Sequence, residues 1–134
     1  MSHFTSVKTK MKNLSLLKRV LKELGYEYTE AEEGQKVQVR GYQGQKTDAE
    51  IVIHASKTYD IGVKVDQDGS VSFVSDWWGV ETTRGVSEEE FINTLTQRYA
   101  YHTVKEACAA KGYMVQEEEV NEEETIKIKV KGWS

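Results

Sequence analysis

The stretch KVQVRGY, residues 36–42, decides the fold that the sequence predicts, because the chain repeats its pattern as KIKVKGW at residues 127–133. In both copies, aliphatic and polar residues alternate, and the stretch closes with a cation, a glycine and an aromatic residue. Alternation with a period of two is typical of a strand with one buried face. The repetition predicts two parts of the chain with the same local fold.

A helix with a recognisable start and end precedes each copy. Asn13 is a favoured N-cap residue for a helix that carries leucine and valine on one stripe and ends at Gly25. Ser87, with Glu90 three residues later, forms the capping box of a second helix, which ends at Gly112. Each terminal glycine is followed by a tyrosine that begins a strand.

Aligning these two glycines makes the two halves of the chain correspond. Three apolar positions of the first helix fall on apolar or small residues of the second: Leu17 on Val104, Val20 on Ala107, and Leu21 on Cys108. We therefore predict two strand–helix–strand–strand units, at about residues 2–42 and 70–133, with extra strands at about residues 49–65. The expected fold is a single α+β domain, residues 1–134, in which two helices cover one face of a twisted, mostly antiparallel sheet, giving two layers.

Composition sets limits on the function. The chain has 134 residues, a formal net charge of −4 and one cysteine, and its three histidines lie far apart. The net charge argues against unspecific coating of nucleic acid. The cysteine and histidine spacing gives no metal-ligand pattern, and no cofactor is expected. No signal peptide or apolar membrane span is present, so we expect the protein to stay in a reducing, soluble compartment.

The first candidate binding segment is RGYQGQKTDAE, residues 40–50. Arg40 and Lys46 are cations suited to phosphate or carboxylate, and Gln43 and Gln45 add hydrogen-bonding groups between glycines that permit close backbone approach. The segment lacks the glycine–lysine–serine/threonine ending of a phosphate-binding loop. A hairpin turn with solvated charges is the alternative reading.

The second candidate is DWWGVETTRG, residues 76–85, which we expect to be irregular. Adjacent side chains on an extended backbone point to opposite sides, so only one of Trp77 and Trp78 is expected in the core. The other would cover an apolar edge or offer a stacking face to a partner. The alternative is that both tryptophans close the core.

The third candidate, TQRYAYH, residues 96–102, lies in the second helix. Gln97, Arg98, Tyr101 and His102 fall on or between two apolar stripes of that helix. An interior Arg98 would need a carboxylate, for which Asp76 or Glu81 is available along the chain. His102 is the plausible general base of this group, so Arg98, His102 and Asp76 are the catalytic candidates, although no nucleophile stands beside them in sequence.

Five stretches together resemble a known family: MSHFT at the start, RGYQGQKT, YDIG, DWWGV and TQRYAYH. The sequence is similar to a family of small proteins of cyanobacteria and algal plastid genomes, carried as a hypothetical chloroplast reading frame and described as a domain of unknown function. The similarity covers nearly the whole chain. It implies a cytoplasmic or stromal setting in a photosynthetic lineage, and it brings no catalytic residues with it.

Three functions are consistent with these observations. The first is a non-enzymatic binding or adaptor protein with a role in assembly or regulation, whose partner is another protein. The second is nucleic-acid or nucleotide binding by a basic and aromatic sheet surface that includes Arg40, Lys46 and the repeat strands. The third is an enzyme that uses Arg98 and His102. The paired tryptophans and the cation–glutamine segment favour the first.

Overall fold

The computed structural model describes residues 3–120 and 126–132, and side-chain surroundings as far as residue 112. The chain divides into two compact units, Met1–Glu90 and Phe91–Ser134. The α+β class predicted from the sequence is confirmed by the helices and the mostly antiparallel strands. The prediction of a single domain stays a prediction.

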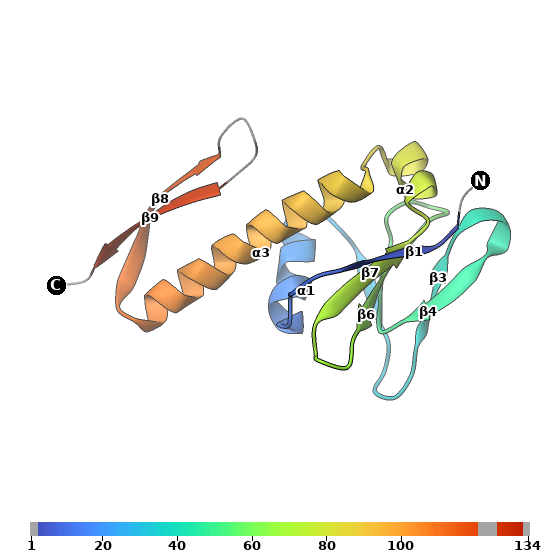
Figure 1. Cartoon of the computed structure of the whole chain (residues 1–134), viewed down its shortest axis with the longest axis horizontal. Helices are drawn as coiled ribbons and strands as arrows, with labels where there is room; N and C mark the ends of the chain where they lie inside the picture. The colour runs from blue at the N-terminus through green and yellow to red at the C-terminus, as the bar shows by residue number, and fades with distance from the viewer. Residues whose placement is uncertain (1–2, 121–125, 133–134) are drawn as a thin grey trace. The chain divides into compact units, whose positions relative to one another are not determined.

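A five-stranded antiparallel sheet forms the centre of the first unit (Figure 1). Its strands follow one another in space in the order β1 (Thr5–Lys8), β7 (Val71–Ser75), β6 (Ile61–Val65), β5 (Ile51–Ile53) and β2 (Tyr28–Glu30). The middle strands β5, β6 and β7 are rich in β-branched residues and almost wholly buried, as expected for strands covered on both faces.

A second, two-stranded antiparallel sheet covers one face of the first. It consists of β3 (Val37–Arg40) and β4 (Lys46–Ala49), joined by a short 3-10 turn, η1 (Tyr42–Gly44). Val39 and Ala49 of this hairpin form a buried cluster with Val52 of the central sheet. The sequence predicted only helices over the sheet, in two layers, so this strand layer corrects that part of the prediction.

Helix α1 (Leu14–Glu23) lies on the opposite side of the sheet from the hairpin (Figure 1). Asn13 caps it as predicted, since its side chain accepts a hydrogen bond from the backbone N–H of Leu16. Four apolar residues of the helix are buried: Leu16, Leu17, Val20 and Leu21. The sheet positions that alternate with the hairpin-covered ones, such as Val63 and Phe73, are fully buried as well. The predicted apolar stripe is confirmed.

Residues 77–84, for which the sequence predicts an irregular segment, form a helix, α2 (Trp77–Arg84). Asp76 is its N-cap and accepts a hydrogen bond from the backbone N–H of Gly79, and Gly85 ends it in the left-handed conformation at φ 84°. The expectation of an extended segment was therefore wrong. The reason is that a capping carboxylate and a terminal glycine make even a short glycine-containing segment helical when it packs on a sheet.

Helix α3 (Glu88–Ala110) begins at the predicted capping box, where the Ser87 hydroxyl accepts a hydrogen bond from the Glu90 N–H. Phe91 and Leu95 are its buried residues. The second unit also contains an antiparallel hairpin of β8 (Tyr113–Val120) and β9 (Ile126–Gly132), as the sequence predicted. Among the described residues, no helix is long and apolar enough to cross a membrane.

The structure does not confirm the predicted duplication. In the first half β2 pairs with β5 and β3 pairs with β4, whereas in the second half β8 and β9 pair with each other. The aligned helix positions differ too, because Leu17 and Val20 are fully buried while Val104 and Ala107 are exposed. The repeated alternation and glycine therefore do not give the two copies the same strand pairing.

Replacing Gly62 of β6 with alanine is expected to destabilise the first unit by about 1–3 kcal/mol, because the hairpin layer leaves no room for a methyl group. A Cβ atom there would lie 2.6 Å from Val39 Cγ2, 2.9 Å from Val74 Cγ1 and 3.0 Å from Ala49 Cβ. Urea unfolding of the Gly62→Ala variant measures the loss. A free energy of unfolding equal to that of the unmodified protein would show that the hairpin does not pack tightly on this face.

Candidate functional site

The first candidate segment lines a pocket at the turn of the β3–β4 hairpin. The pocket has a volume of about 480 Å³ and is lined by Arg40, Gly41, Tyr42, Gln43, Gly44, Gln45, Lys46, Thr58 and Tyr59. Seven of these residues are consecutive in the chain, and Thr58 and Tyr59 come from the segment that leads into β6. We call it the hairpin-turn pocket.

The turn itself has a backbone conformation that directs its polar side chains outward. Gln43 and Gly44 both have positive φ, 51° and 79°, and the N–H of Gln45 donates to the carbonyl of Tyr42. This is the pattern of a type I′ turn, whose twist suits a two-residue hairpin connection. Gln43, Gln45 and Lys46 are exposed as a result, as a binding role for them requires.

Arg40 fixes the wall of the pocket through a bidentate ion pair with Asp60. Arg40 Nε lies 2.9 Å from Asp60 Oδ2, and Arg40 Nη2 lies 2.9 Å from Asp60 Oδ1. The guanidinium also donates to the carbonyls of Lys57 and Ser56, at 2.7 and 3.4 Å. Arg40 therefore ties the hairpin to residues 56–60, and this role uses most of its hydrogen-bonding capacity.

Asp60 is almost fully buried, and its charge is balanced inside the protein. Burial by itself raises the pKa of the Asp60 carboxyl, but the hydrogen bonds from Arg40 and the guanidinium charge outweigh this effect and leave the pKa below its usual range. His54 Nδ1 lies 3.5 Å from Asp60 Oδ1. The buried carboxylate therefore links the hairpin to the end of β5.

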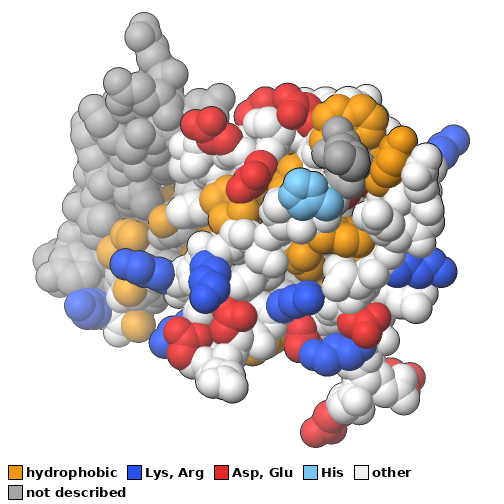
Figure 2. Space-filling model, turned by 45° about the vertical axis from the view of Figure 1, so that its right-hand side comes forward, with side chains coloured by type: hydrophobic (Ala, Val, Ile, Leu, Met, Phe, Trp, Pro, Cys, Tyr) orange, Lys and Arg blue, Asp and Glu red, His pale blue; other side chains and the backbone are white. Residues whose placement is uncertain are grey.

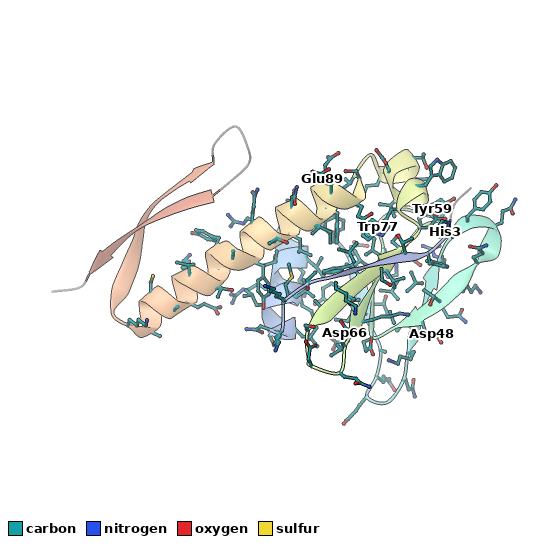
Figure 3. The ribbon with its side chains drawn as sticks, viewed as in Figure 1. His3, Asp48, Tyr59, Asp66, Trp77 and Glu89 are labelled. Carbon is teal, nitrogen blue, oxygen red and sulfur yellow. The ribbon has the colours of Figure 1, made fainter. Side chains whose placement is uncertain are left out.

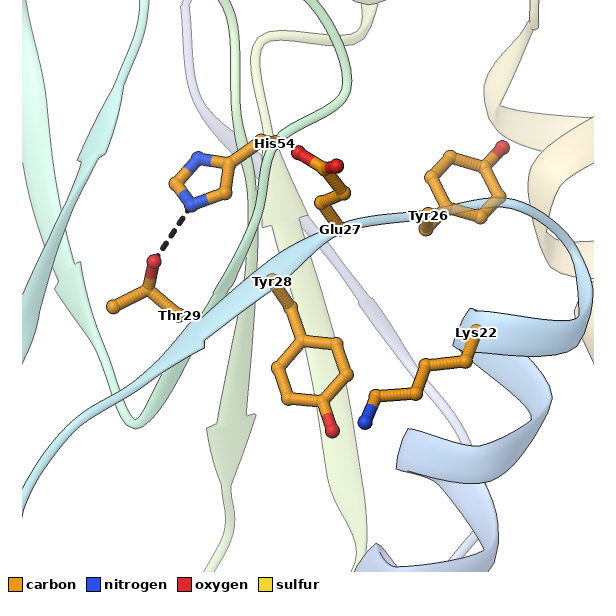
Figure 4. Close-up of a pocket in the computed structure, with 6 residues that line it drawn as sticks. All are labelled: Lys22, Tyr26, Glu27, Tyr28, Thr29 and His54. Atoms are coloured by element: carbon orange, nitrogen blue, oxygen red, sulfur yellow. Dashed lines mark hydrogen bonds between the residues drawn. The ribbon is translucent and has the colours of Figure 1, made fainter.

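His54 continues this network to the edge of the sheet, where it lines a second pocket (Figure 4). Its Nε2 atom lies 2.7 Å from the hydroxyl oxygen of Thr29 on β2. The remaining lining residues are Lys22, Tyr26, Glu27 and Tyr28. The order hydroxyl, imidazole, carboxylate resembles a nucleophile–base–acid relay, but both oxygens of Asp60 already accept from Arg40. We interpret the network as structural.

Asp76 joins the hairpin turn to α2. Its Oδ1 atom accepts from the N–H of Gly79 and its Oδ2 atom accepts from the N–H of Tyr42, both at 3.2 Å. The carboxylate is buried, and each of its oxygens is used by a backbone group. These contacts give Asp76 a positioning role for the Tyr42 backbone.

The aromatic side chains at this end of the unit divide into buried and exposed ones. Trp77 is 7% exposed and its indole N–H donates to the carbonyl of Thr5, whereas Trp78 is 56% exposed. Of the two alternatives left open by the sequence, the structure has one tryptophan buried and one exposed, although on a helix and not on an extended backbone. The ring of Tyr42 stands edge-on to that of Trp78, with centroids 6.1 Å apart.

Tyr59 packs on α2 where a glycine leaves space for its ring. A Cβ atom at Gly79 would lie 2.0 Å from Tyr59 Cε1, so the ring occupies the volume of the missing side chain. Figure 3 shows Tyr59 and Trp77 at the same end of the first unit, with Asp48 and Asp66 at the other end. Hydrophobic side chains also reach the surface among polar ones in the upper right of Figure 2.

Comparison with known proteins identifies the family. A family described as "Protein of unknown function (DUF1257)" matches residues 20–129. The chain belongs to this family. The resemblance to the hypothetical chloroplast reading frame family stated from the sequence is thereby confirmed.

Three algal relatives are similar to the chain over nearly its whole length, each named "Uncharacterized protein ycf35". The protein of Guillardia theta is 34% identical over 138 residues, which cover 99% of this chain and 98% of the relative. The proteins of Cyanophora paradoxa and Pyropia yezoensis are 27% and 23% identical, covering 98% and 99% of those relatives. No solved structure matches the chain.

The structure brings together only some of the site residues that were predicted from the sequence. Arg40, Gln43, Gln45 and Lys46 line the hairpin-turn pocket, and Trp78 is next to it through Tyr42. Asp76 and Trp77 are buried in the same unit. The remaining predicted site residues belong to the second unit: Gln97, Arg98, Tyr101 and His102. Their binding and catalytic roles stay predictions.

The nominated residues of α3 form a local aromatic and cationic cluster. The Arg98 guanidinium lies 4.5 Å from the centroid of the Tyr101 ring, and Lys105 Nζ lies 5.7 Å from it. The ring of His102 stands edge-on to that of Tyr101, with centroids 5.1 Å apart. Stacking of this kind orders the side chains along the helix.

Sequence reasoning missed Tyr59 and Asp60 as parts of the site. The sequence does contain a signal in residues 59–65, where Asp60 and Gly62 alternate with apolar residues and so lie on one face of the strand. A carboxylate and a glycine on one strand face indicate that another layer approaches closely there with a cation. The side chains of Lys127, Lys129, Lys131 and Trp133, which supported nucleic-acid binding, lie outside the described side chains.

No group of three or more potential metal ligands occurs among the residues that the structure describes. The chemistry available at the hairpin-turn pocket is therefore that of amide groups, one exposed lysine and aromatic faces. Such groups bind and orient a partner, and none of them is arranged as a nucleophile with its base.

Replacing Asp60 with asparagine is expected to lower the free energy of unfolding at pH 7 by about 2 kcal/mol, because an amide N–H₂ would then face the Arg40 guanidinium. The folded-state pKa of Asp60 is lower than that of the unfolded chain, so the pair contributes fully above about pH 4–5. This contribution is lost as the pH falls through the folded-state pKa. The difference in the free energy of unfolding between the unmodified protein and Asp60→Asn should thus shrink from pH 7 to pH 3.

Urea unfolding at several pH values measures this difference. The exposed Asp48 at the far end of the unit provides the matched control, since Asp48→Asn makes the same chemical change outside the network. An Asp60→Asn deficit that is constant with pH, or equal to that of Asp48→Asn, would contradict the assigned ion pair.

Proposed function

We propose that this protein is a binding or adaptor protein that recognises another protein through the exposed face of the hairpin turn and α2. This face consists of Tyr42, Gln43, Gln45, Lys46 and Trp78, and we call it the Tyr42–Trp78 surface. The observation that carries the proposal is the contrast between neighbours on α2, where Trp77 is 7% exposed and Trp78 is 56% exposed.

An exposed tryptophan held by its surroundings is a favourable anchor for a partner. Tryptophan and tyrosine bury a large area at low conformational cost, and they dominate the binding energy of many interfaces. Here Trp78 lies on a capped helix, and Tyr42 is fixed by the hydrogen bond from its N–H to Asp76. Because the surface is already ordered, little conformational entropy would be lost on binding.

The polar part of the surface supports specificity. Gln43 and Gln45 offer both donors and acceptors at the rim, and Lys46 adds a positive charge. Amide and aromatic groups around a central tryptophan form the composition expected of a protein interface. An assembly or regulatory role in the cytoplasm or plastid stroma fits the setting that the family resemblance implies.

Nucleic-acid binding remains the second candidate, since the same aromatic faces beside Lys46 would suit unpaired bases. It predicts affinity that falls steeply with salt, because phosphate contacts release counterions. The enzymatic alternative with Asp76, Arg98 and His102 has less support, because both carboxylate oxygens of Asp76 already accept backbone N–H groups.

Replacing Trp78 with alanine is expected to weaken binding of the natural partner by at least about 2 kcal/mol while leaving the fold intact. The partner is first captured by placing the photoreactive residue benzoylphenylalanine at position 78 and irradiating in a lysate of the source organism. Titration calorimetry with the purified partner then compares the unmodified protein with Trp78→Ala.

Val65 provides the control, because it is a 37% exposed hydrophobic residue of β6 in the same unit and lies outside the surface. Benzoylphenylalanine at position 65 should not capture the partner, and Val65→Ala should bind it normally. Equal capture from both positions, or undiminished affinity of Trp78→Ala, would rule out this surface. Capture of a nuclease-sensitive species would show that the partner is a nucleic acid and not a protein.

A further inference from the structure

Residues 55–58 also line a third pocket in the first unit, and its side chains differ in charge from those of the other two pockets. It has a volume of about 600 Å³ and is lined by Ala55, Ser56, Lys57, Thr58, Thr83 and Arg84. Two cations and three hydroxyl groups thus face one hollow, and no carboxylate is among the lining residues. We call it the Lys57–Arg84 pocket.

Arg84 is held in place by groups that leave its charge unbalanced. Its Nη1 atom donates to the carbonyl of Ala55 at 3.0 Å, and its guanidinium lies 4.2 Å from the centroid of the Tyr26 ring. A carbonyl and an aromatic face orient a guanidinium without neutralising it. Arg84 also forms a side-chain hydrogen bond with Tyr26, and the N–H groups that neither contact uses are preorganised for an acceptor.

Lys57 and Arg84 form no ion pair with a carboxylate in the part of the chain that the structure describes. The carboxylate nearest to Lys57 along the chain, Asp60, is occupied by Arg40 and contacted by His54. In a chain with a formal net charge of −4, two unneutralised cations in one pocket are a local excess of positive charge. Such an excess attracts an anion.

The hydroxyl groups of the pocket are ordered by the same short segment. Ser56 Oγ accepts a hydrogen bond from the N–H of Tyr59 at 3.1 Å and lies 2.9 Å from Thr83 Oγ1. Because the Thr83 hydroxyl donates to the carbonyl of Gly79 at 2.6 Å, the Ser56 hydroxyl donates to Thr83 Oγ1, and this pair is fixed within the protein. Thr58 adds a hydroxyl that is bonded to no other group among the described residues.

We propose that the Lys57–Arg84 pocket binds a phosphate monoester group. At pH 7 such a group carries a charge between −1.5 and −2 and three acceptor oxygens. Two cations balance this charge, the guanidinium N–H groups that are not used inside the protein donate to its oxygens, and the Thr58 hydroxyl is a further donor. A carboxylate has one charge and two oxygens, so it matches this set of donors less well. The inference is independent of the Tyr42–Trp78 surface.

Titration calorimetry of the full chain at low ionic strength tests the assignment, with inorganic phosphate and adenosine monophosphate as probes. Saturable binding of phosphate is expected, with affinity reduced about tenfold in Lys57→Gln and in Arg84→Gln. Lys10→Gln is the matched control, because it removes the same charge from an exposed lysine outside the pocket. It should bind as the unmodified protein does.

Arg84 also contacts Tyr26, so Arg84→Gln risks a change in folding. Lys57→Gln is the deciding variant, because the Lys57 side chain forms no hydrogen bond or ion pair with the other described residues. Tighter binding of adenosine monophosphate than of phosphate would assign a nucleotide source, and equal binding a free phosphate group. Absence of saturable phosphate binding, or equal affinity of Lys57→Gln and Lys10→Gln, would overturn the proposal.

Discussion

The ion pair between Arg40 and Asp60 is the constraint on which the functional surfaces of the first unit depend. Residues 54–60 form part of the wall of each of the three pockets described, and the Arg40 guanidinium contacts this segment at Ser56, Lys57 and Asp60. The β3–β4 hairpin lies on the sheet through a small apolar cluster of Val39, Ala49 and Val52. The ion pair therefore fixes the hairpin layer and the pocket walls at the same time.

The pair is asymmetric, so the cost of desolvation falls on only one of its two charges. The Asp60 side chain is 2% exposed, whereas that of Arg40 is 44% exposed. Only the carboxylate is removed from water, and it gains two guanidinium hydrogen bonds and one from the Arg40 backbone. The cation keeps its contact with solvent, so a polar layer between hairpin and sheet is compatible with a stable core.

The sequence predicted the elements that local signals determine and missed those that pairing determines. Asn13 and Ser87 mark their helices because a cap acts within one turn. Strand pairing is not local, and so the resemblance between residues 36–42 and 127–133 suggested a symmetry that the β3–β4 and β8–β9 pairings do not show. Asp60 was missed for the same reason, since its partner is 20 residues away along the chain.

The tryptophan pair shows where a structural explanation ends and a functional one begins. Trp77 is explained by the fold, because its ring is buried and its indole N–H is bonded to Thr5. Nothing in the packing of α2 requires a large apolar ring at the next position, where any polar residue would serve a helix of eight residues. The ring of Trp78, which is 56% exposed and stands edge-on to Tyr42, is therefore the part of α2 that the proposed partner would cover.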